Sequence, residues 1–241
     1  AQKCGHTIIT PLPALVALEP ERPLPGYLQG VVLKNVSAEL RIEGKKEAAE
    51  FGEMAFLDGY LAGPIIITLS RAAVQALHAG HKIEIILDLK PALDHATLDR
   101  RLLREIENNR GIDIAGLIAK LLPADLRRYC LEQTGLTGNK KADQMSAEQR
   151  KALRFWLKEQ HYPIAGHAPW EQAIVTAGGI ATSEINPNTL ESKIIANLHF
   201  AGEIIDIDAD TGGYNLQAAF STGWLAGMSA AQAIKNAGKA R

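Results

Sequence analysis

The chain has 241 residues and a mass of 26.0 kDa, which allows one or two domains and a core that needs no disulfide or metal ion to fold. Lys and Arg number 26 and Asp and Glu 27, so the formal net charge is −1, which argues against a dedicated nucleic-acid-binding protein with a strongly basic domain. Apolar residues make up 46% and charged residues 22%, proportions that exclude intrinsically disordered and fibrous classes.

The cysteine content and the length of the apolar stretches indicate the cellular compartment of the protein. Cys4 and Cys130 are too far apart for a CxxC motif, and reduced thiols are typical of the cytoplasm. The longest apolar runs, such as 83–87, are far shorter than the roughly 20 residues that a membrane span needs. Residues 1–20 lack the basic and apolar regions of a signal peptide. We therefore expect a cytoplasmic protein without a membrane partner.

The first ninety residues predict mainly strands. A short strand over 6–10 ends at Pro11, and five prolines between 11 and 26 indicate an extended connector. Apolar residues at 36, 38, 40 and 42 alternate with polar ones, as in a half-buried strand. A hairpin turn at 44–46 and a second strand over 47–57 follow. A helix over 65–79, closed by Gly80, and a strand over 82–89 complete this part.

Helical patterns dominate residues 94–160. Leu98, Leu102 and Ile106 lie on one helical face, and two more helical stretches, 113–122 and 124–133, are separated by Pro123. Ser146 with Gln149 forms the capping box of a further helix. After this region we expect strands over 172–176 and 198–201 and a long, alanine-rich helix over 214–237.

The segment most informative about function is 200–217. A short apolar strand ends at Gly202-Glu203, and Thr211-Gly212-Gly213 opens the long helix after an acidic loop. Glycines at a helix N-terminus let backbone N–H groups approach a ligand, and the helix dipole favours an anionic or electron-rich group there. An isolated Gly-Gly is more often only a turn before a capped helix. A Gly-Gly that follows a strand, an acidic residue and an acidic loop, and that precedes the side-chain amides of Asn215 and Gln217, is much rarer than an isolated Gly-Gly.

Several motifs in the same order resemble one known family. They are Ala-Ile-Val-Thr-Ala-Gly-Gly-Ile (173–180), Glu-Ile-Asn-Pro-Asn-Thr-Leu-Glu-Ser-Lys (184–193), Phe-Ala-Gly-Glu (200–203), Thr-Gly-Gly-Tyr-Asn-Leu-Gln (211–217) and Ala-Phe-Ser-Thr-Gly (219–223). In these motifs the chain resembles the BaiN/RdsA-type NAD(P)/FAD-dependent oxidoreductases, also called aminoacetone-oxidase-like flavoproteins. Shorter motifs at 28–31, 51–54 and 63–66 extend the resemblance over essentially the whole chain.

The resemblance implies a fold of mixed α/β and α+β class. A partial, split FAD-binding domain of Rossmann-like type would carry an inserted β-rich domain and a small helical part. Residues 1–26 would be a connector from the first FAD-domain segment, 27–93 the β-rich insert, 94–169 its helical part and 170–241 the returning FAD-domain segment.

The resemblance also implies which residues approach the cofactor. Glu203 would bind ribityl or ribose hydroxyls, and the start of the long helix would bring amides to the flavin pyrimidine end. The implied cofactor-binding residues are Thr176, Gly178, Gly202, Glu203, Thr211, Gly212, Gly213, Tyr214, Asn215 and Gln217, with Gly179 nearby.

Two departures from the family pattern stand out. The insert reads Phe-Leu-Asp-Gly-Tyr-Leu-Ala-Gly-Pro at 56–64, so the Thr and Ser hydroxyls common in the family are missing. No G-x-G-x-x-G turn, which grips the FAD pyrophosphate in such enzymes, occurs in residues 1–241. We therefore expect this chain to be the C-terminal portion of a longer flavoprotein. The missing N-terminal FAD-domain segment would be its partner, and the chain by itself would bind FAD weakly or not at all.

The expected function is that of a fragment of a flavin-dependent oxidoreductase. NAD(P)H would deliver hydride to FAD, which would reduce a small-molecule substrate or oxygen. The sequence nominates no catalytic acid or base, and its seven histidines show no metal-ligand spacing. The alternative is a non-catalytic binding or interaction module that keeps the fold without the cofactor. No nucleic-acid partner is expected from the overall charge.

Overall fold

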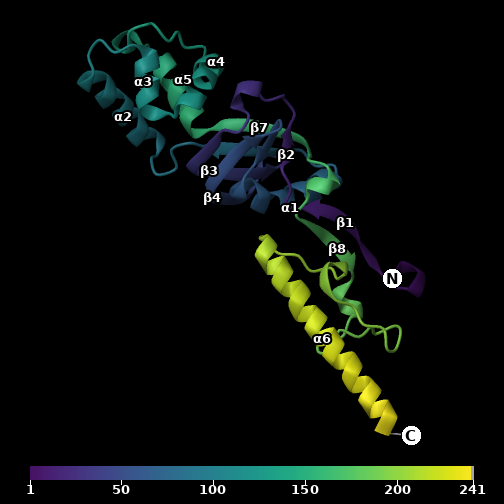
Figure 1. Ribbon diagram of the computed structural model, residues 1–241. Coiled ribbons are helices and arrows are strands. Elements are labelled where there is room, and N and C mark those ends of the chain that lie inside the picture. Colours follow the sequence, from purple (N-terminus) through teal and green to yellow (C-terminus); the bar gives the residue numbers. More distant parts are fainter. Residues whose placement is uncertain (240–241) are drawn as a thin grey trace.

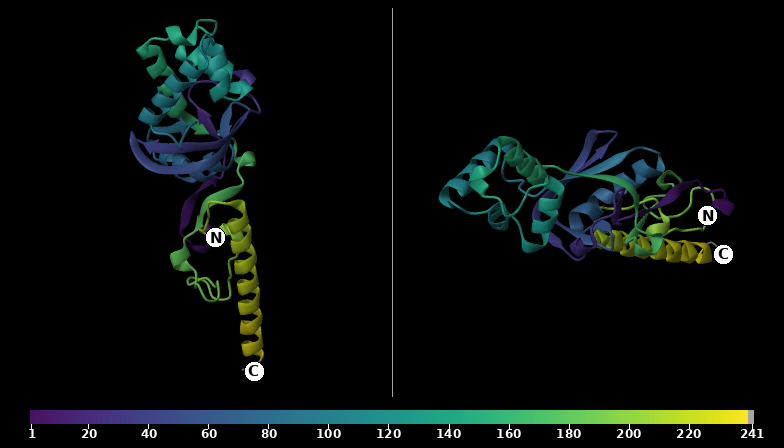
Figure 2. Two further views of the ribbon diagram at one scale, coloured as in Figure 1. Left: turned by 90° about the vertical axis from the view of Figure 1, so that its left-hand side faces the viewer. Right: turned by 90° about the horizontal axis from the view of Figure 1, so that it is seen from above.

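The computed structural model describes residues 1–239 of the chain, and the side chains of residues 1–236. The molecule is elongated, with a β-barrel in the middle (Figure 1). A cluster of helices lies at one end of the barrel, and a two-stranded ribbon leads from the other end to a long C-terminal helix, an arrangement that the two further views repeat (Figure 2). The motifs at 173–223 and the helical cluster therefore lie at opposite ends of the molecule.

The described residues form one closed barrel with the strand order β2-β5-β4-β3-β6-β7, in which all neighbours are antiparallel. Its strands are β2 (Leu18–Pro20), β3 (Val32–Ile42), β4 (Lys45–Leu57), β5 (Tyr60–Ala62), β6 (Ile83–Asp88) and β7 (Gln160–His167). Closure leaves no sheet edge open for pairing with another chain.

Alternation along β3 places its apolar side chains inside the barrel. Ala38 and Leu40 are fully buried and pair with Leu87 and Ile85 of β6, so apolar residues from adjacent strands share the interior. The turn to β4 is made by Glu43 and Gly44, whose φ angles of 49° and 74° are those of a tight hairpin turn. The turn predicted at 44–46 therefore lies one residue earlier.

Helix α1 (Pro64–His78) packs against the barrel strands with its apolar face. Ile66, Leu69 and Ala73 of this face are buried. The helix begins with proline at its first turn and ends before Gly80, which has a φ of 81°, so the predicted helix and its terminal glycine are confirmed.

The helical cluster contains α2 (His95–Asn108), α3 (Ile114–Leu121), α4 (Ala124–Thr134) and α5 (Ala147–Lys158). Side chains of Asp94, Asp113 and Ser146 accept hydrogen bonds from the first turns of α2, α3 and α5, and the capping box of Ser146 with Gln149 is present. The structure confirms the helices predicted in this region. They could be predicted because helix caps and apolar stripes are signals within neighbouring residues.

The remaining strands and α-helix of the described chain are β1 (Ile8–Ala14), β8 (Val175–Ile180) and α6 (Gly212–Lys239), and six short 3-10 turns connect the elements. β1 and β8 form an antiparallel two-stranded sheet, and Ile180 adds an isolated parallel bridge to Ile205. The mixed α and β content and the β-rich unit are as expected, whereas a Rossmann-like split domain stays a prediction. Among the described helices, none has the length and apolarity to cross a bilayer.

Three predicted elements need correction. The first strand does not end at Pro11, because β1 continues through both prolines to Ala14 in a sheet of only two strands, where a missing N–H is tolerated. The strand predicted over 172–176 begins only at Val175, and 198–201 forms an isolated bridge at His199 instead of a strand. Barrel strand β7, at 160–167, was missed within the stretch interpreted as helical.

Candidate functional site

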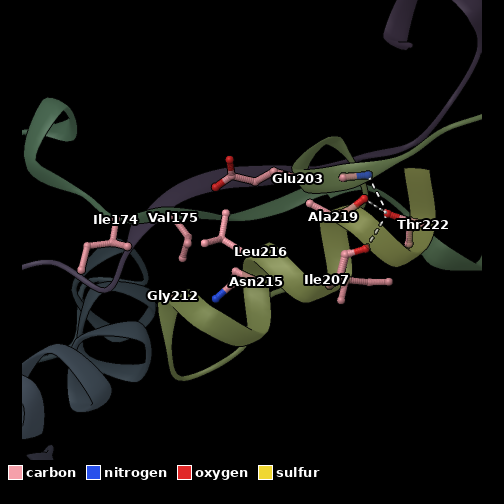
Figure 3. A pocket seen from close by; sticks show the side chains of 11 residues that line it. Ile174, Val175, Glu203, Ile207, Gly212, Asn215, Leu216, Ala219 and Thr222 are labelled. Atoms are coloured by element: carbon pink, nitrogen blue, oxygen red, sulfur yellow. Dashed lines mark hydrogen bonds between the residues drawn. The ribbon is translucent and has the colours of Figure 1, made fainter. Parts of the chain in front are cut away.

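A hollow of about 230 Å³ lies beside the first turns of α6, between that helix and β8 (Figure 3). Four of the predicted cofactor-binding residues line it, namely Gly202, Glu203, Gly212 and Asn215. The other lining residues are mainly apolar or small: Ile174, Val175, Ile207, Leu216, Ala218, Ala219 and Thr222. Tertiary structure thus brings together segments that lie about 40 residues apart in the chain.

The other predicted residues lie around this hollow without lining it. Thr176 and Gly178 belong to β8, Thr211 precedes α6, and Gly213 is the second residue of α6. Tyr214 and Gln217 are in the first turns of α6, where Tyr214 is 69% exposed and the Gln217 amide donates to Ser221 Oγ at 3.0 Å. Both side chains therefore point to solvent in the described structure.

Glu203 connects the turn Gly202–Ile204 to strand β8. Its Oε1 accepts a hydrogen bond from the backbone N–H of Thr176. Within the described part of the chain, Oε2 of the same carboxylate has no hydrogen-bond partner. Glu203 is therefore positioned by one oxygen and can accept a hydroxyl hydrogen bond with the other.

The Asn215 side chain forms hydrogen bonds within its own loop. Its Nδ2 donates to the carbonyl oxygens of Ala209 and Thr211, both at 2.8 Å, and its Oδ1 accepts from the N–H of Ala209 at 3.1 Å. These bonds hold the loop against the first turn of α6. The side-chain amide is occupied, so the ligand-facing donors of the helix start are backbone groups.

Those backbone donors belong to Gly212 and Gly213. In the described residues neither N–H has a hydrogen-bond partner, as is usual for the first turn of a helix. A Cβ at Gly213 would meet nothing within 4 Å, and one at Gly212 would lie 3.3 Å from Ile174 Cγ2. The partial positive charge of the helix terminus therefore faces a space that a ligand atom can enter.

The structure itself explains why positions 178 and 179 are glycine. Their φ angles are 87° and 136°, and a Cβ would lie 2.5 Å from the carbonyl oxygens of Thr10 and Ile204, respectively. The close approach of β8 to its neighbours therefore requires glycine here, with or without a ligand.

No local sequence pattern pointed to two anchors of the site. Thr222 Oγ1 accepts from the N–H of Gly202 at 2.9 Å and donates to the carbonyl of Ala218 at 2.7 Å, which fixes the turn to α6. Asp208, whose side chain is only 3% exposed, pairs with Arg71 of α1, with Nη2 and Oδ1 3.0 Å apart. Both partners are distant in sequence and become visible only in the fold.

An exposed apolar surface adjoins the hollow. Phe220 and Trp224 on α6 are 70% and 68% exposed, values unusual for such large side chains in a self-contained domain. Other large apolar residues that are exposed on α6 or in the segments beside it are Ile174, Ile204, Ile207, Tyr214, Leu216, Met228 and Ile234. We refer to this set, with Phe220 and Trp224, as the α6 apolar surface.

Known proteins resemble this chain in sequence over nearly its whole length. Residues 12–175 match the family described as HI0933-like protein barrel and H2TH domain, a range that contains the barrel and the helical cluster. The chain is 28% identical over 96% of its length to a 3-dehydro-bile acid delta(4,6)-reductase of Clostridium scindens. It is 27% identical over 93% of its length to a ribosomal RNA dihydrouridine synthase of Escherichia coli, and 24% identical over 95% to the protein of that name from Haemophilus influenzae.

These matches cover little more than half of the relatives. The chain aligns with 56% of the reductase and with 53% and 54% of the two synthases. The alignment with all three nevertheless includes almost all of the present chain, with the hollow and the start of α6. The chain belongs to the HI0933-like family, the BaiN/RdsA-type group of oxidoreductases that the sequence motifs indicate.

Proposed function

We propose that this chain is the flavin-facing part of a flavin-dependent oxidoreductase that takes hydride from NAD(P)H and reduces a small organic substrate or oxygen. The observation that carries the proposal is the hollow at the start of α6. It combines the backbone N–H of Gly212, which has no partner among the described residues, one carboxylate oxygen free to accept and an apolar lining, and the N–H of Gly213 follows next along the helix. FAD, when bound, supplies the ring that accepts and passes on the hydride.

The residues present fit such a ring. The N–H groups of Gly212 and Gly213 would donate to the oxygen atoms of the pyrimidine end, and the α6 dipole would favour negative charge there. Glu203 would accept from a hydroxyl of the ribityl or ribose chain. Ile174, Ile207 and Leu216 would exclude water from one side of the ring.

The names of the relatives narrow the substrate class. Both a delta(4,6)-reductase acting on a 3-dehydro-bile acid and a dihydrouridine synthase denote hydrogen added across a carbon–carbon double bond conjugated to a carbonyl. We extend this reaction class to the present chain: NAD(P)H and one proton are consumed, and the double bond becomes a single bond with two new C–H bonds. Which conjugated compound is bound is left to experiment.

The proposal includes a partner segment that covers the α6 apolar surface. The relatives are nearly twice as long as the aligned region, and residues 1–241 contain no G-x-G-x-x-G turn for the FAD pyrophosphate. A nucleotide-binding segment in contact with α6 would bury Phe220 and Trp224 and enclose the hollow. This segment is the occupant that we propose for the surface.

The test compares this chain with an extended protein that includes whatever sequence precedes Ala1. We expect the extended protein to purify with about one flavin per chain and to oxidise NAD(P)H in the presence of an α,β-unsaturated ketone. Gly213→Val should lose most of the flavin, because its side chain would project into the open space at the start of α6 that we assign to the ring. Gly227→Val, also on α6 and with nothing within 4 Å of a Cβ, is the matched control for helix propensity.

Two results would overturn the proposal. If the extended protein carries no flavin absorbance and shows no turnover, the alternative of a non-catalytic binding module is favoured. If Gly213→Val and Gly227→Val lose flavin equally, the start of α6 is not the site that contacts the ring.

A further inference from the structure

The turn that carries Glu203 has no capping side chain of its own. Gly202–Ile204 forms a single 3-10 turn, and the residue before it, Ala201, has no side chain that can accept a hydrogen bond. Gly202 has a φ of 74°, so the chain enters the turn in the left-handed region that favours glycine. One helical turn is not stable by itself in water. The direction of the Glu203 side chain therefore depends on contacts with other elements.

Thr222 on α6 supplies the cap. Its Oγ1 accepts a hydrogen bond from the N–H of Gly202 at 2.9 Å. The same hydroxyl donates to the carbonyl oxygens of Ala218 and Ala219 at 2.7 and 3.2 Å (Figure 3). Because its proton is committed to the preceding turn of α6, a lone pair of Oγ1 is free to accept from the Gly202 amide. The turn is thereby fixed to the helix whose start forms one side of the hollow.

Two elements together determine where the Glu203 carboxylate lies. Its backbone is anchored to α6 through the preceding residue, Gly202, and its Oε1 accepts from the backbone N–H of Thr176 on β8. The side chain is exposed, so burial does not hold it in place. Glu203 lines the hollow, and these two hydrogen bonds are the contacts that keep it there.

We propose that Thr222 is a positioning residue for the cofactor: by holding the Gly202 amide, it keeps the Glu203 carboxylate where it can accept from a ribityl hydroxyl of the flavin. The Thr222 hydroxyl already donates and accepts within the protein, so it acts through Glu203 and not by contact with the ring. This inference rests on the flavin function proposed above. It adds a division of labour, in which the start of α6 binds the ring and the Thr222–Glu203 unit selects a flavin with a hydroxyl-bearing chain.

Substitutions at position 222 separate the hydroxyl from the shape of the side chain. Thr222→Val keeps the β-branched shape and a similar helix propensity but leaves the Gly202 N–H without its acceptor. Thr222→Ser keeps the hydroxyl and should behave like the unmodified chain. Ser221→Ala is the matched control, because it removes a hydroxyl from the adjacent position on α6. There Ser221 Oγ accepts from the Gln217 amide at 3.0 Å and not from the turn.

The first measurement uses the 241-residue chain without any flavin. Residue-resolved amide hydrogen exchange should show that Thr222→Val speeds exchange of the Gly202 and Thr176 N–H groups by roughly three- to tenfold, as expected for the loss of one hydrogen bond. Thr222→Ser and Ser221→Ala should change both rates by less than about twofold. Faster exchange at Gly202 with an unchanged rate at Thr176 would overturn the inference, because Glu203 would then keep its place without Thr222.

The second measurement compares two flavins on the extended protein after its bound flavin has been removed. Riboflavin carries the ribityl hydroxyls, and lumiflavin has the same ring with a methyl group in place of that chain. Thr222→Val should weaken riboflavin binding by about fivefold or more and lumiflavin binding by less than about twofold. In a Glu203→Ala background, Thr222→Val should have no further effect on riboflavin binding, because the carboxylate that it positions is gone.

The outcomes distinguish this inference from the proposed function. Equal weakening of riboflavin and lumiflavin by Thr222→Val would overturn the inference and leave the ring site at α6 standing, since a collapse of the hollow affects both flavins alike. Thr222→Ser with the same loss as Thr222→Val would also overturn it. If the unmodified extended protein binds neither flavin, the proposed function fails and this inference fails with it.

Discussion

His6 lies between an acid and a serine, in an arrangement that resembles a catalytic triad. Its Nδ1 is 3.0 Å from Glu184 Oε2, and its Nε2 is 3.0 Å from Ser192 Oγ. Ser192 is 7% exposed, and its Oγ also accepts from the N–H groups of Ile194 and Ile195 at 3.0 and 2.8 Å. A buried oxygen whose lone pairs are occupied is a turn cap and not a nucleophile.

Glu184 of this group makes folding stability dependent on acid pH. Hydrogen bonds from Thr7, with help from His6, hold its pKa below the ordinary value of about 4.3. The folded state therefore binds the proton less readily than the unfolded state does, and the stabilisation is complete above about pH 5 and is lost as the pH falls through the lowered pKa. Urea unfolding between pH 7 and pH 3 should show that the free energy of unfolding falls more steeply with decreasing pH for the unmodified chain than for Glu184→Gln. Glu47→Gln, at an exposed position, is the control, and parallel curves for Glu184→Gln and the unmodified chain would contradict the assignment.

At the scale of elements, the Arg71–Asp208 pair joins α1 of the barrel to the loop before α6. Asp208 is 3% exposed at its side chain and Arg71 is 42% exposed. Arg71→Ala leaves a buried carboxylate without its partner, so we expect a loss of about 1–3 kcal/mol, moderated by the solvent that reaches Arg71. A urea-unfolding double-mutant cycle with Asp208→Ala measures the coupling; additive losses would show that the pair does not connect the two elements.

Strand β8 depends on glycine where it approaches β1. Gly178→Ala imposes a φ of 87° on a residue with a Cβ and brings that atom to 2.5 Å from the Thr10 carbonyl oxygen. We expect a loss of at least about 2 kcal/mol in the free energy of unfolding. Gly227→Ala on α6 meets nothing within 4 Å and should be neutral or stabilising by up to about 1 kcal/mol. Thermal unfolding of both variants makes the comparison, and an unchanged Tm for Gly178→Ala would show that β8 relaxes.

The elements that were predicted well are those whose signals are local. The capping box of Ser146 and the glycine after α1 lie within a few residues of the helices that they delimit. Strand β7 carries Pro163 and Gly166 and directly follows α5, so its pattern gives little indication of a strand. Its pairing with β2 and β6, which are distant in sequence, decides its conformation.

At the scale of the whole molecule, Trp224 should report on what covers α6. It is 68% exposed in the described structure, so its emission should be that of a solvent-exposed indole. In an extended protein with a segment over the α6 apolar surface, the emission should shift to the blue, because the ring loses contact with water. The difference spectrum against Trp224→Phe isolates this residue from Trp156 and Trp170. An identical Trp224 emission in both proteins would mean that the surface is not covered by that segment.

The sequence by itself determined the family, the helices, the main β-hairpin and the group of residues at 202–215 from which the candidate site is built, because motifs, caps and periodicity are properties of neighbouring residues. Only the tertiary structure decided that the barrel closes through β7, that Asn215 holds its own loop, and that Gly212 and Glu203 line the same hollow. Strand closure and the lining of a hollow both depend on contacts between residues far apart in the chain, which local patterns do not record.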